Sequence, residues 1–409
     1  TKEQMSDIHS AEELLNSYIT YIESSVEENL DTFTTFILSG AVGMIVEGFD
    51  KAIIIDSRTY PARSVQEPES DKVLRGSHEG FVETVIFNTA LLRRKIRSPD
   101  LTLKSHQIGT QSKTDIVICY LEGTVDKKLL KKVVERINSI DVKSLAMSQE
   151  SLRECLIPHQ AWNPFPKVRY TERPDTAAAS IYDGNIIIFS DGSPSAMIIP
   201  TGIFDFFQDI NDFYFPPLVG TFIRYVRVFS YVMTFFLVPT WYLITLYESV
   251  LPEWINIFQV KEPNEVPIIF QLLIVEFVID ILRLASLNTP SALSNSFSVV
   301  AALVLGEFAI KSGLFVSEVV LFMAFVAISN FTQPSYELGY AIKISRIFVL
   351  ICTALFHVWG YGASILIVMS VIVTTKTISG YTYLYPLIPF NWKALSSLLI
   401  RKSLKCKYK

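Results

Sequence analysis

Residues 228–246 read VFSYVMTFFLVPTWYLITL and contain no charged side chain. A helix needs about 20 mostly apolar residues to cross the hydrocarbon core of a bilayer, where only helices and closed barrels satisfy every backbone group. The stretch therefore predicts a membrane-spanning helix. Arg224 and Arg227 precede it and Trp254 follows it, an order that favours insertion from the cytoplasmic side with an aromatic anchor on the far side.

Further apolar segments follow this helix. They lie at 266–282, 294–310, 316–331 and 347–375. The last segment would be about 43 Å long at about 1.5 Å per residue, which exceeds the hydrocarbon core of roughly 30 Å. It is therefore either one tilted helix or two helices separated at Trp359-Gly360-Tyr361-Gly362. We predict an all-α polytopic transmembrane domain at 216–392, with about four to six membrane segments, and a basic cytoplasmic tail at 393–409.

The second apolar segment carries ionisable side chains. Glu276 and Asp280 are one helical turn apart and Arg283 follows three residues later, so the three can share one face. Charges at membrane depth are costly unless they are paired or hydrated. The segment is interpreted as an ion-paired packing seam, as part of an ion path, or as a re-entrant helix in the interface. Glu307 in the third segment is a fourth candidate intramembrane charge.

The third segment has a stripe of small and hydroxylated side chains. The stripe consists of Ser294, Ser298, Ala301, Ala302, Leu305 and Ala309. Small residues that recur at three- and four-residue steps form tight helix–helix seams, and such faces also line pores. Both interpretations stay open, and the six residues are the candidate pore lining.

The residues before 216 predict a soluble α/β domain. Hairpins are expected at 41–56 and 177–200, because turn sequences such as Asp183-Gly184 and Asp191-Gly192 separate their apolar runs. The two hairpins have similar patterns, so we expect them to belong to one sheet.

A shared sheet would divide the soluble half into two subdomains. Residues 1–97 and 161–215 would form the first α/β subdomain, and residues 98–160 would form an inserted second one. Apolar spacing predicts strands at 101–106 and 115–121 and helices at 8–30, 77–97, 126–140 and 149–156.

Sequence motifs of enzymes and nucleotide-binding proteins are missing from the chain. It has no G-x-x-x-x-G-K-[ST], G-x-G-x-x-G or H-E-x-x-H sequence, and its five histidines are far apart. The net charge is −4, and no block of basic residues alternates with aromatic ones. We therefore predict a protein that is not an enzyme, needs no cofactor or metal, and does not bind nucleic acid.

Several long stretches resemble one known family. They are SVQEPESDKVLRGSHEGFVET at 64–84, NTALLRRKIRSPDL at 88–101, RYTERPDTAA at 169–178, DGSPSAMIIPTGIFDFFQ at 191–208 and QPSYELGYAIKISR at 333–346. They resemble the A subunits of the bacterial spore germination receptors, the GerA family, over about residues 39 to 390. NPFPKVRYTERPD at 163–175 is similar to a sporulation-specific branch of that family. The matching motif residues are Arg169, Glu172, Arg173, Pro174, Asp175, Pro334, Tyr336 and Glu337.

The resemblance implies a multi-pass protein of the spore inner membrane, whose soluble half faces the cytoplasm or spore core. The first residues, TKEQMSDIHS, contain no apolar segment of a signal peptide, which fits that side. The expected partners are the lipid bilayer, other germination membrane proteins and further copies of the chain, which would form or support an ion channel that releases ions during germination. A secondary transporter and a non-conducting membrane scaffold are the alternatives.

The intact protein should depend on lipid or detergent for solubility, because its apolar helices would otherwise face water. We expect size-exclusion chromatography with light scattering to show aggregates in plain buffer and one discrete species in detergent. A single monodisperse species in plain buffer would contradict both the membrane domain and the channel.

Overall fold

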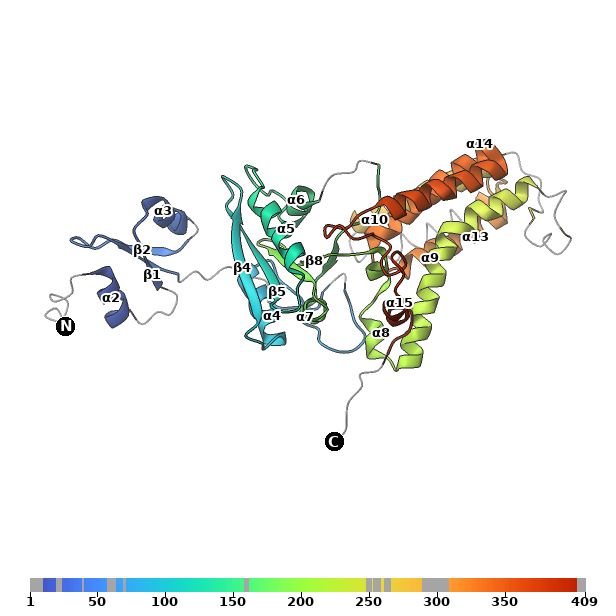
Figure 1. Cartoon of the computed structure of the whole chain (residues 1–409). Coiled ribbons are helices and arrows are strands. Elements are labelled where there is room, and N and C mark those ends of the chain that lie inside the picture. Colours follow the sequence, from blue (N-terminus) through green and yellow to red (C-terminus); the bar gives the residue numbers. More distant parts are fainter. Residues whose placement is uncertain are drawn as a thin grey trace, which may run out of the picture. The chain divides into compact units, whose positions relative to one another are not determined.

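The computed structural model describes residues 10–19, 24–38, 40–56, 64–68, 71–157, 162–247, 252, 259–260, 266–288 and 309–402. They belong to two compact units, Thr1–Arg63 and Ser64–Lys409, which are described one at a time (Figure 1).

The first unit has a three-stranded antiparallel sheet and two helices. Its elements in chain order are α2 (Ala11–Tyr18), β1 (Ser24–Glu27), α3 (Leu30–Leu38), β2 (Val42–Met44) and β3 (Ala52–Ile55), with sheet order β1-β3-β2. The hairpin predicted at 41–56 is confirmed. The single helix predicted at 8–30 is wrong, because its apolar residues belong to different elements: Leu14 in α2 and Val26 in β1 both pack around Ile53.

The second unit begins with a five-stranded antiparallel sheet. Its strands are β4 (Leu101–Ile108), β5 (Thr114–Leu121), β6 (Arg169–Thr171), β7 (Ile186–Ser190) and β8 (Ala196–Ile199), in the order β4-β5-β7-β8-β6. Its helices are α4 (Val85–Lys95), α5 (Lys127–Asn138), α6 (Gln149–Leu156) and α7 (Pro174–Tyr182). The strands predicted at 101–106 and 115–121 and the helices predicted at 126–140 and 149–156 are present.

Helices cover both faces of this sheet because its central strands are apolar on both faces. Ile116 and Ile118 of β5 belong to a core shared with α5 and α6. Val117 and Cys119 of the same strand belong to a second core shared with α4 and α7. Successive side chains of a strand point to opposite faces, so this continuous apolar run requires a helix layer on each side.

Two predictions for the segment after residue 170 are wrong. Residues 177–182 are not a strand but lie in α7, which starts with Pro174 at its first turn, a position where proline needs no amide donor. Gly184 has a φ of +91° and ends this helix, so Asp183-Gly184 is a helix terminus and not a hairpin turn. The helix predicted at 77–97 also begins later, at Val85.

The hairpins at 41–56 and 177–200 do not share a sheet, so that prediction is also wrong. β2 and β3 pair in the first unit, whereas β7 pairs with β5 and β8 in the second. β5 and β7 are interior strands with hydrogen-bonding partners on both edges, and the local hairpin pattern does not specify those partners. We propose a boundary at residues 63–64 in place of the inserted subdomain predicted at 98–160.

The rest of the second unit is mostly helical. Its elements are η1 (Ile203–Phe207), α8 (Asn211–Tyr214), α9 (Pro217–Leu246), α10 (Ile268–Asn288), α12 (Ala309–Lys311), α13 (Ser317–Phe331), α14 (Tyr336–Thr374) and α15 (Trp392–Leu399). α9, α10 and α13 share one apolar core, in which Trp241, Leu272 and Met323 are buried. Among the described helices, α9 and α14 are long and apolar enough to cross a membrane, judged by length and composition.

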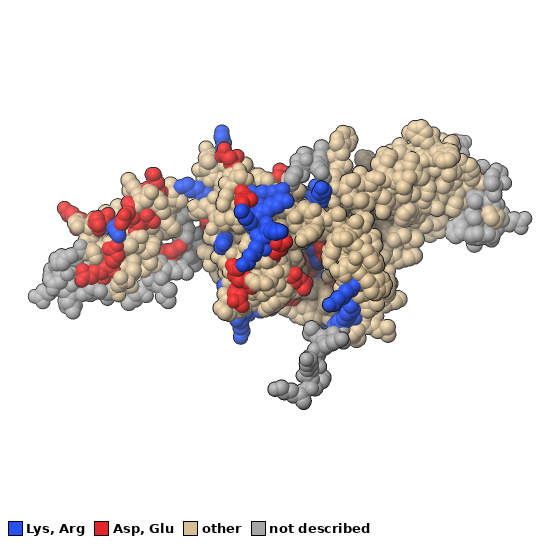
Figure 2. Space-filling view, in the orientation of Figure 1, with Lys and Arg blue, Asp and Glu red and all other residues tan. Residues whose placement is uncertain are grey.

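Large apolar side chains also cover the outside of these helices. Four examples, each about two-thirds exposed, are Phe222, Phe277, Leu321 and Leu366. Figure 2 shows the helical part as a surface with few charged residues, in contrast to the sheet domain. An apolar surface of this extent is typical of a face that contacts lipid or another protein.

α14 reverses direction at His357. The residue has a φ of +54° and a ψ of −134°, which lie outside the helical region. Few non-glycine residues adopt a positive φ. Val349 before it and Val368 after it lie in one apolar cluster, and Tyr361 hydrogen-bonds Thr240 of α9 at 2.7 Å. The segment predicted at 347–375 is therefore broken, close to the predicted Trp359–Gly362. Each half is about 25–30 Å long at about 1.5 Å per residue.

The reversal should depend on Gly360 but not on Gly362. A Cβ at Gly360 would collide with the carbonyl oxygen of Cys352, whereas a Cβ at Gly362 meets nothing within 4 Å. We expect Gly360→Ala to lower the free energy of unfolding in detergent by about 1–3 kcal/mol. The matched control Gly362→Ala should be neutral or stabilising by up to about 1 kcal/mol. Equal stability of the two variants would contradict the close approach at Gly360.

Candidate functional site

Four charged side chains meet inside the helical part. Glu276 and Asp280 come from α10, and Lys343 and Arg346 come from α14. Arg346 Nη2 donates to Glu276 Oε1 at 2.6 Å, and Lys343 Nζ lies 3.0 Å from the same oxygen. Lys343 also forms an ion pair with Asp280, and Arg346 Nη1 donates to the backbone oxygen of Thr234 in α9 at 2.8 Å.

This cluster, named here the α10–α14 ion cluster, is balanced in charge; three of its side chains are buried, whereas that of Asp280 is 32% exposed. Arg346 is 2% exposed, Lys343 6% and Glu276 7%. A buried charge without a partner costs several kcal/mol, so the two acids and two bases stabilise each other as a set. Because Arg346 contacts both Glu276 and the backbone of Thr234, one side chain joins three helices.

The sequence identified only the acidic half of this cluster. Lys343 and Arg346 were missed, although they are three residues apart and stand in an apolar run that follows Glu337. That spacing places them on one helix face. This pattern could have identified them as partners of the two acids.

Arg283 has different neighbours from the two acids of its helix. Its guanidinium carbon lies 4.9 Å from the ring centre of Tyr336 and 5.0 Å from that of Tyr340, with Phe331 also near. These rings belong to α13 and α14, so Arg283 links the end of α10 to the start of α14 through cation–π contacts.

The candidate pore lining is outside the described part of the chain. Ser294, Ser298, Ala301, Ala302 and Leu305 lie between the described ranges, as does the candidate charge Glu307. Ala309 is the first residue of α12, and its side chain is not described.

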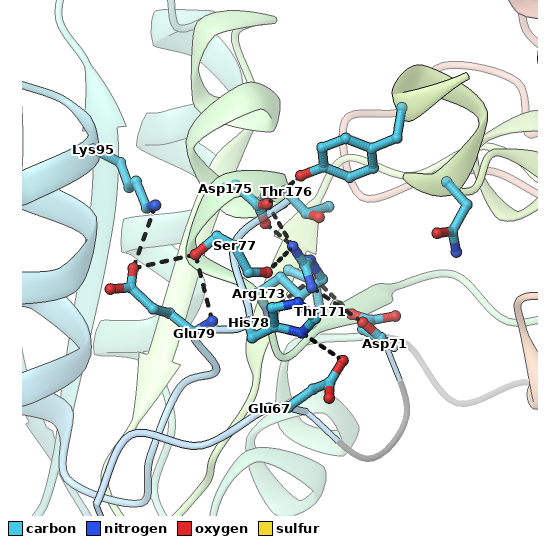
Figure 3. A network of polar contacts seen from close by, with 12 residues as sticks. Glu67, Asp71, Ser77, His78, Glu79, Lys95, Thr171, Arg173, Asp175 and Thr176 are labelled. Atoms are coloured by element: carbon cyan, nitrogen blue, oxygen red, sulfur yellow. Dashed lines mark hydrogen bonds and ion pairs between the residues drawn. The ribbon is translucent and has the colours of Figure 1, made fainter. Parts of the chain in front are cut away.

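A second network surrounds Arg173 in the sheet domain (Figure 3). Arg173 is fully buried and makes two hydrogen bonds to Asp175, Nε to Oδ1 at 3.0 Å and Nη2 to Oδ2 at 2.6 Å. Nη2 also donates to the backbone oxygen of Ser77 at 2.7 Å. Tyr214 of α8 donates to Asp175 Oδ2 at 3.1 Å, so the network ties the start of α7 to the segment that leads into α9.

Asp71 connects this network to β6. Its Oδ2 accepts hydrogen bonds from Thr171 Oγ1 at 2.8 Å and from the backbone amide of Glu172 at 3.0 Å. Asp71 and Ser77 belong to the stretch at 64–84, and Thr171 and Glu172 to the stretch at 169–178. Two of the family-like stretches are thus held together by charge-assisted hydrogen bonds.

A cavity of about 250 Å³ lies where the sheet domain meets the helices, and it is named here the junction cavity. The predicted motif residues that line it are Arg169, Glu172, Pro334, Tyr336 and Glu337. Arg173 and Asp175 form the network described above, and Pro174 begins α7. Motifs far apart in the sequence therefore converge on one place, which the sequence did not predict.

A third ion cluster fixes the start of α9. Asp212 is fully buried, and its carboxylate binds Arg227 at 2.8 and 3.1 Å and Arg224 at 3.2 Å. Arg224 also donates to the backbone oxygens of Ser397 and Leu398 in α15. The sequence analysis interpreted Arg224 and Arg227 as cations that precede the first predicted membrane span. In the structure, both guanidinium groups make hydrogen bonds within the protein.

These contacts connect the sheet domain to the ion cluster through α14. The helix starts at the junction cavity, contacts Arg283 in its first turns and then contributes Lys343 and Arg346. α14 therefore joins the junction cavity to the α10–α14 ion cluster within one element.

Comparison with known proteins identifies similar chains. The sequence matches the family model described as Bacillus/Clostridium GerA spore germination protein over residues 1–409. It is 42% identical to stage V sporulation protein AF of Bacillus subtilis (strain 168), over 95% of this chain and 77% of that protein. It is 28% identical to spore germination protein KA of the same organism, over 98% of this chain and 73% of that protein.

Two further similarities concern other species. The chain is 29% identical to spore germination protein GerLA of Bacillus cereus, over 95% of this chain and 79% of that protein. A solved structure, the N-terminal domain of the A subunit of the Bacillus megaterium spore germinant receptor GerK3, is 38% identical to the matched part. That match covers 29% of this chain and 93% of that chain, with a TM-score of 0.24.

Removal of Arg346 should destabilise the protein strongly. We expect Arg346→Met to lower the free energy of unfolding in mixed micelles by about 3–5 kcal/mol, because Glu276 loses its shortest ion pair while buried. Lys393→Met, which removes an exposed cation on α15, is the control and should change it by less than about 0.5 kcal/mol. The double variant E276Q/R346M should recover part of the loss, since it leaves no unpaired carboxylate. Equal effects of R346M and K393M would exclude a structural role of the cluster.

Proposed function

Because the chain belongs to the GerA family of spore germination proteins, we propose that it is a membrane subunit of a spore germination complex. In this proposal it assembles with further copies of itself to form or support an ion channel, and it acts with other germination membrane proteins. The observation that carries the proposal is the convergence of the two motif stretches on the junction cavity, at the start of the helix that bears Lys343 and Arg346.

The placement in a membrane is supported by the helical part. α9 and α14 have sufficient length and apolar composition, and the reversal at His357 turns α14 into two runs of roughly membrane thickness. Large apolar side chains project outward from these helices. We assign the protein to the spore inner membrane as a multi-pass protein, in accordance with the family.

The orientation is supported by contacts at one end of the helices. Thr375, directly after α14, accepts a hydrogen bond from Asn163 at 2.7 Å, and Arg401 donates its backbone amide to Thr221 at the start of α9. The end of α14 and the C-terminal segment thus lie on the same side as the sheet domain. With basic residues in the tail, this side is proposed to be the cytoplasm or spore core.

Conduction is proposed for the third apolar segment, with the α10–α14 ion cluster holding the surrounding helices. The four charges of that cluster bind one another, which suits a packing seam better than a row of ion ligands. The stripe Ser294, Ser298, Ala301, Ala302, Leu305 and Ala309 would line the pore. One such face per chain is sufficient when several copies surround a common axis.

A non-conducting scaffold is the second candidate, and the balanced pairing of Glu276, Asp280, Lys343 and Arg346 is the observation that favours it. A scaffold would use the same helices to hold partner proteins without a pore of its own. The mass of the complex in detergent distinguishes the two, because a channel of this kind needs a ring of copies and a scaffold does not.

Potassium efflux from liposomes tests the channel. The protein is reconstituted alone and with its partner subunits, and Ser298→Trp is compared with Leu321→Trp, which places the same side chain on an exposed position of α13. We expect Ser298→Trp to reduce the efflux rate at least tenfold, because the indole would fill the pore, and Leu321→Trp to leave it within twofold.

Two results would contradict the proposal. Efflux at the parent rate in Ser298→Trp would remove the third segment from the pore, provided that size-exclusion profiles show an intact complex. Efflux no higher than that of empty liposomes, with every partner present, would favour the scaffold.

A further inference from the structure

A second cavity at the junction is lined by cations. It has a volume of about 390 Å³ and is named here the basic cavity. The side chains that line it include Lys132, Arg136, Lys167 and Lys376. None of the described residues that line it is acidic.

The four cations come from three separate parts of the chain. Lys132 and Arg136 are one turn apart on α5, Lys167 precedes β6, and Lys376 follows α14. Figure 2 shows that Lys and Arg also gather over α5 as a whole. Lys132, Arg136 and Lys376 alone bring like charges together from two of these parts, which is unfavourable on its own, and an anion bound between them would relieve the repulsion.

The walls of the basic cavity are held in place. Ile378 is buried in the same core as Leu129 and Ile137 of α5, which fixes the chain after α14 against that helix. Lys376 pairs with Thr382 in a short antiparallel bridge, and Arg136 Nη1 donates to the backbone oxygen of Leu156 at 2.8 Å. The pKa of Lys167 is lowered by burial, as expected for an ammonium partly removed from water.

The position of the basic cavity suggests which anion it takes. Thr374, one of its lining residues, is the last residue of α14. If α14 crosses the bilayer as in the proposed function, on which this step rests, the cavity lies at the level of the lipid headgroups on the side of the sheet domain. Basic groups at that level attract anionic phospholipids.

We propose that the basic cavity binds a phosphate group, and that this phosphate belongs to an anionic phospholipid of the leaflet beside the sheet domain. Lys132 and Arg136 would contact it from α5 and Lys376 from the end of α14. The lipid would then hold α5 of the sheet domain and the end of α14 together.

The test uses the full chain in nanodiscs of phosphatidylcholine with or without phosphatidylglycerol, and bound lipid is measured by native mass spectrometry. The double variant K132Q/K376Q is compared with K127Q/K128Q, which removes two exposed charges from the same helix outside the basic cavity. We expect K132Q/K376Q to weaken phosphatidylglycerol binding by about tenfold or more, and K127Q/K128Q to weaken it less than threefold. The variant K376R retains the charge and should keep the parent affinity.

Each other result overturns the proposal. Equal losses in the two double variants would mean general attraction to a charged surface. Saturation of the site by inorganic phosphate in phosphatidylcholine nanodiscs, with no preference for phosphatidylglycerol, would assign it to a free anion instead of lipid. Failure of the parent chain to enter nanodiscs would count against the proposed function, whereas insertion without lipid preference counts only against the lipid site.

Discussion

The buried guanidinium of Arg346 places the strongest constraint on the helical part. A charge in an apolar region has to be paired, and its partners here are Glu276 on α10 and the backbone of Thr234 on α9. In the proposed membrane setting, apolar helices gain little hydrophobic free energy from burial against one another, so polar contacts of this kind contribute to their alignment. Together with the apolar core that α9, α10 and α13 share, these contacts hold α9, α10 and α14 in register.

The same principle operates at the junction with the sheet domain. Arg173 and Asp175 fix the start of α7, and Asp212 with Arg224 and Arg227 fixes the start of α9. Between them lies the junction cavity, where the first residues of α14 face β6. Ion pairs thus fix elements of the sheet domain and of the helical part near this cavity.

Much of the architecture could be predicted from local patterns. The order of a soluble α/β half and an apolar helical half follows from composition, and helix α6 and strands β4 and β5 were located from apolar spacing alone. Errors occurred where one pattern fits two structures. Ala177–Tyr182 is apolar enough for a strand, but Pro174 before it and Gly184 after it favour the helix that formed. The acids of the ion cluster were recognised, while their basic partners were not.

The sequence by itself determined the apolar half, the family and the presence of ionisable side chains among the apolar helices. Periodicity, composition and the residues of a motif are local properties of the chain, so they can be recognised without the fold. Only the tertiary structure decided that β7 pairs with β5, that α14 reverses at His357, and that Glu276 meets Lys343 and Arg346. Each of these depends on contacts between residues distant in sequence, whose free energy is realised only when the elements pack together, so no local pattern specifies them.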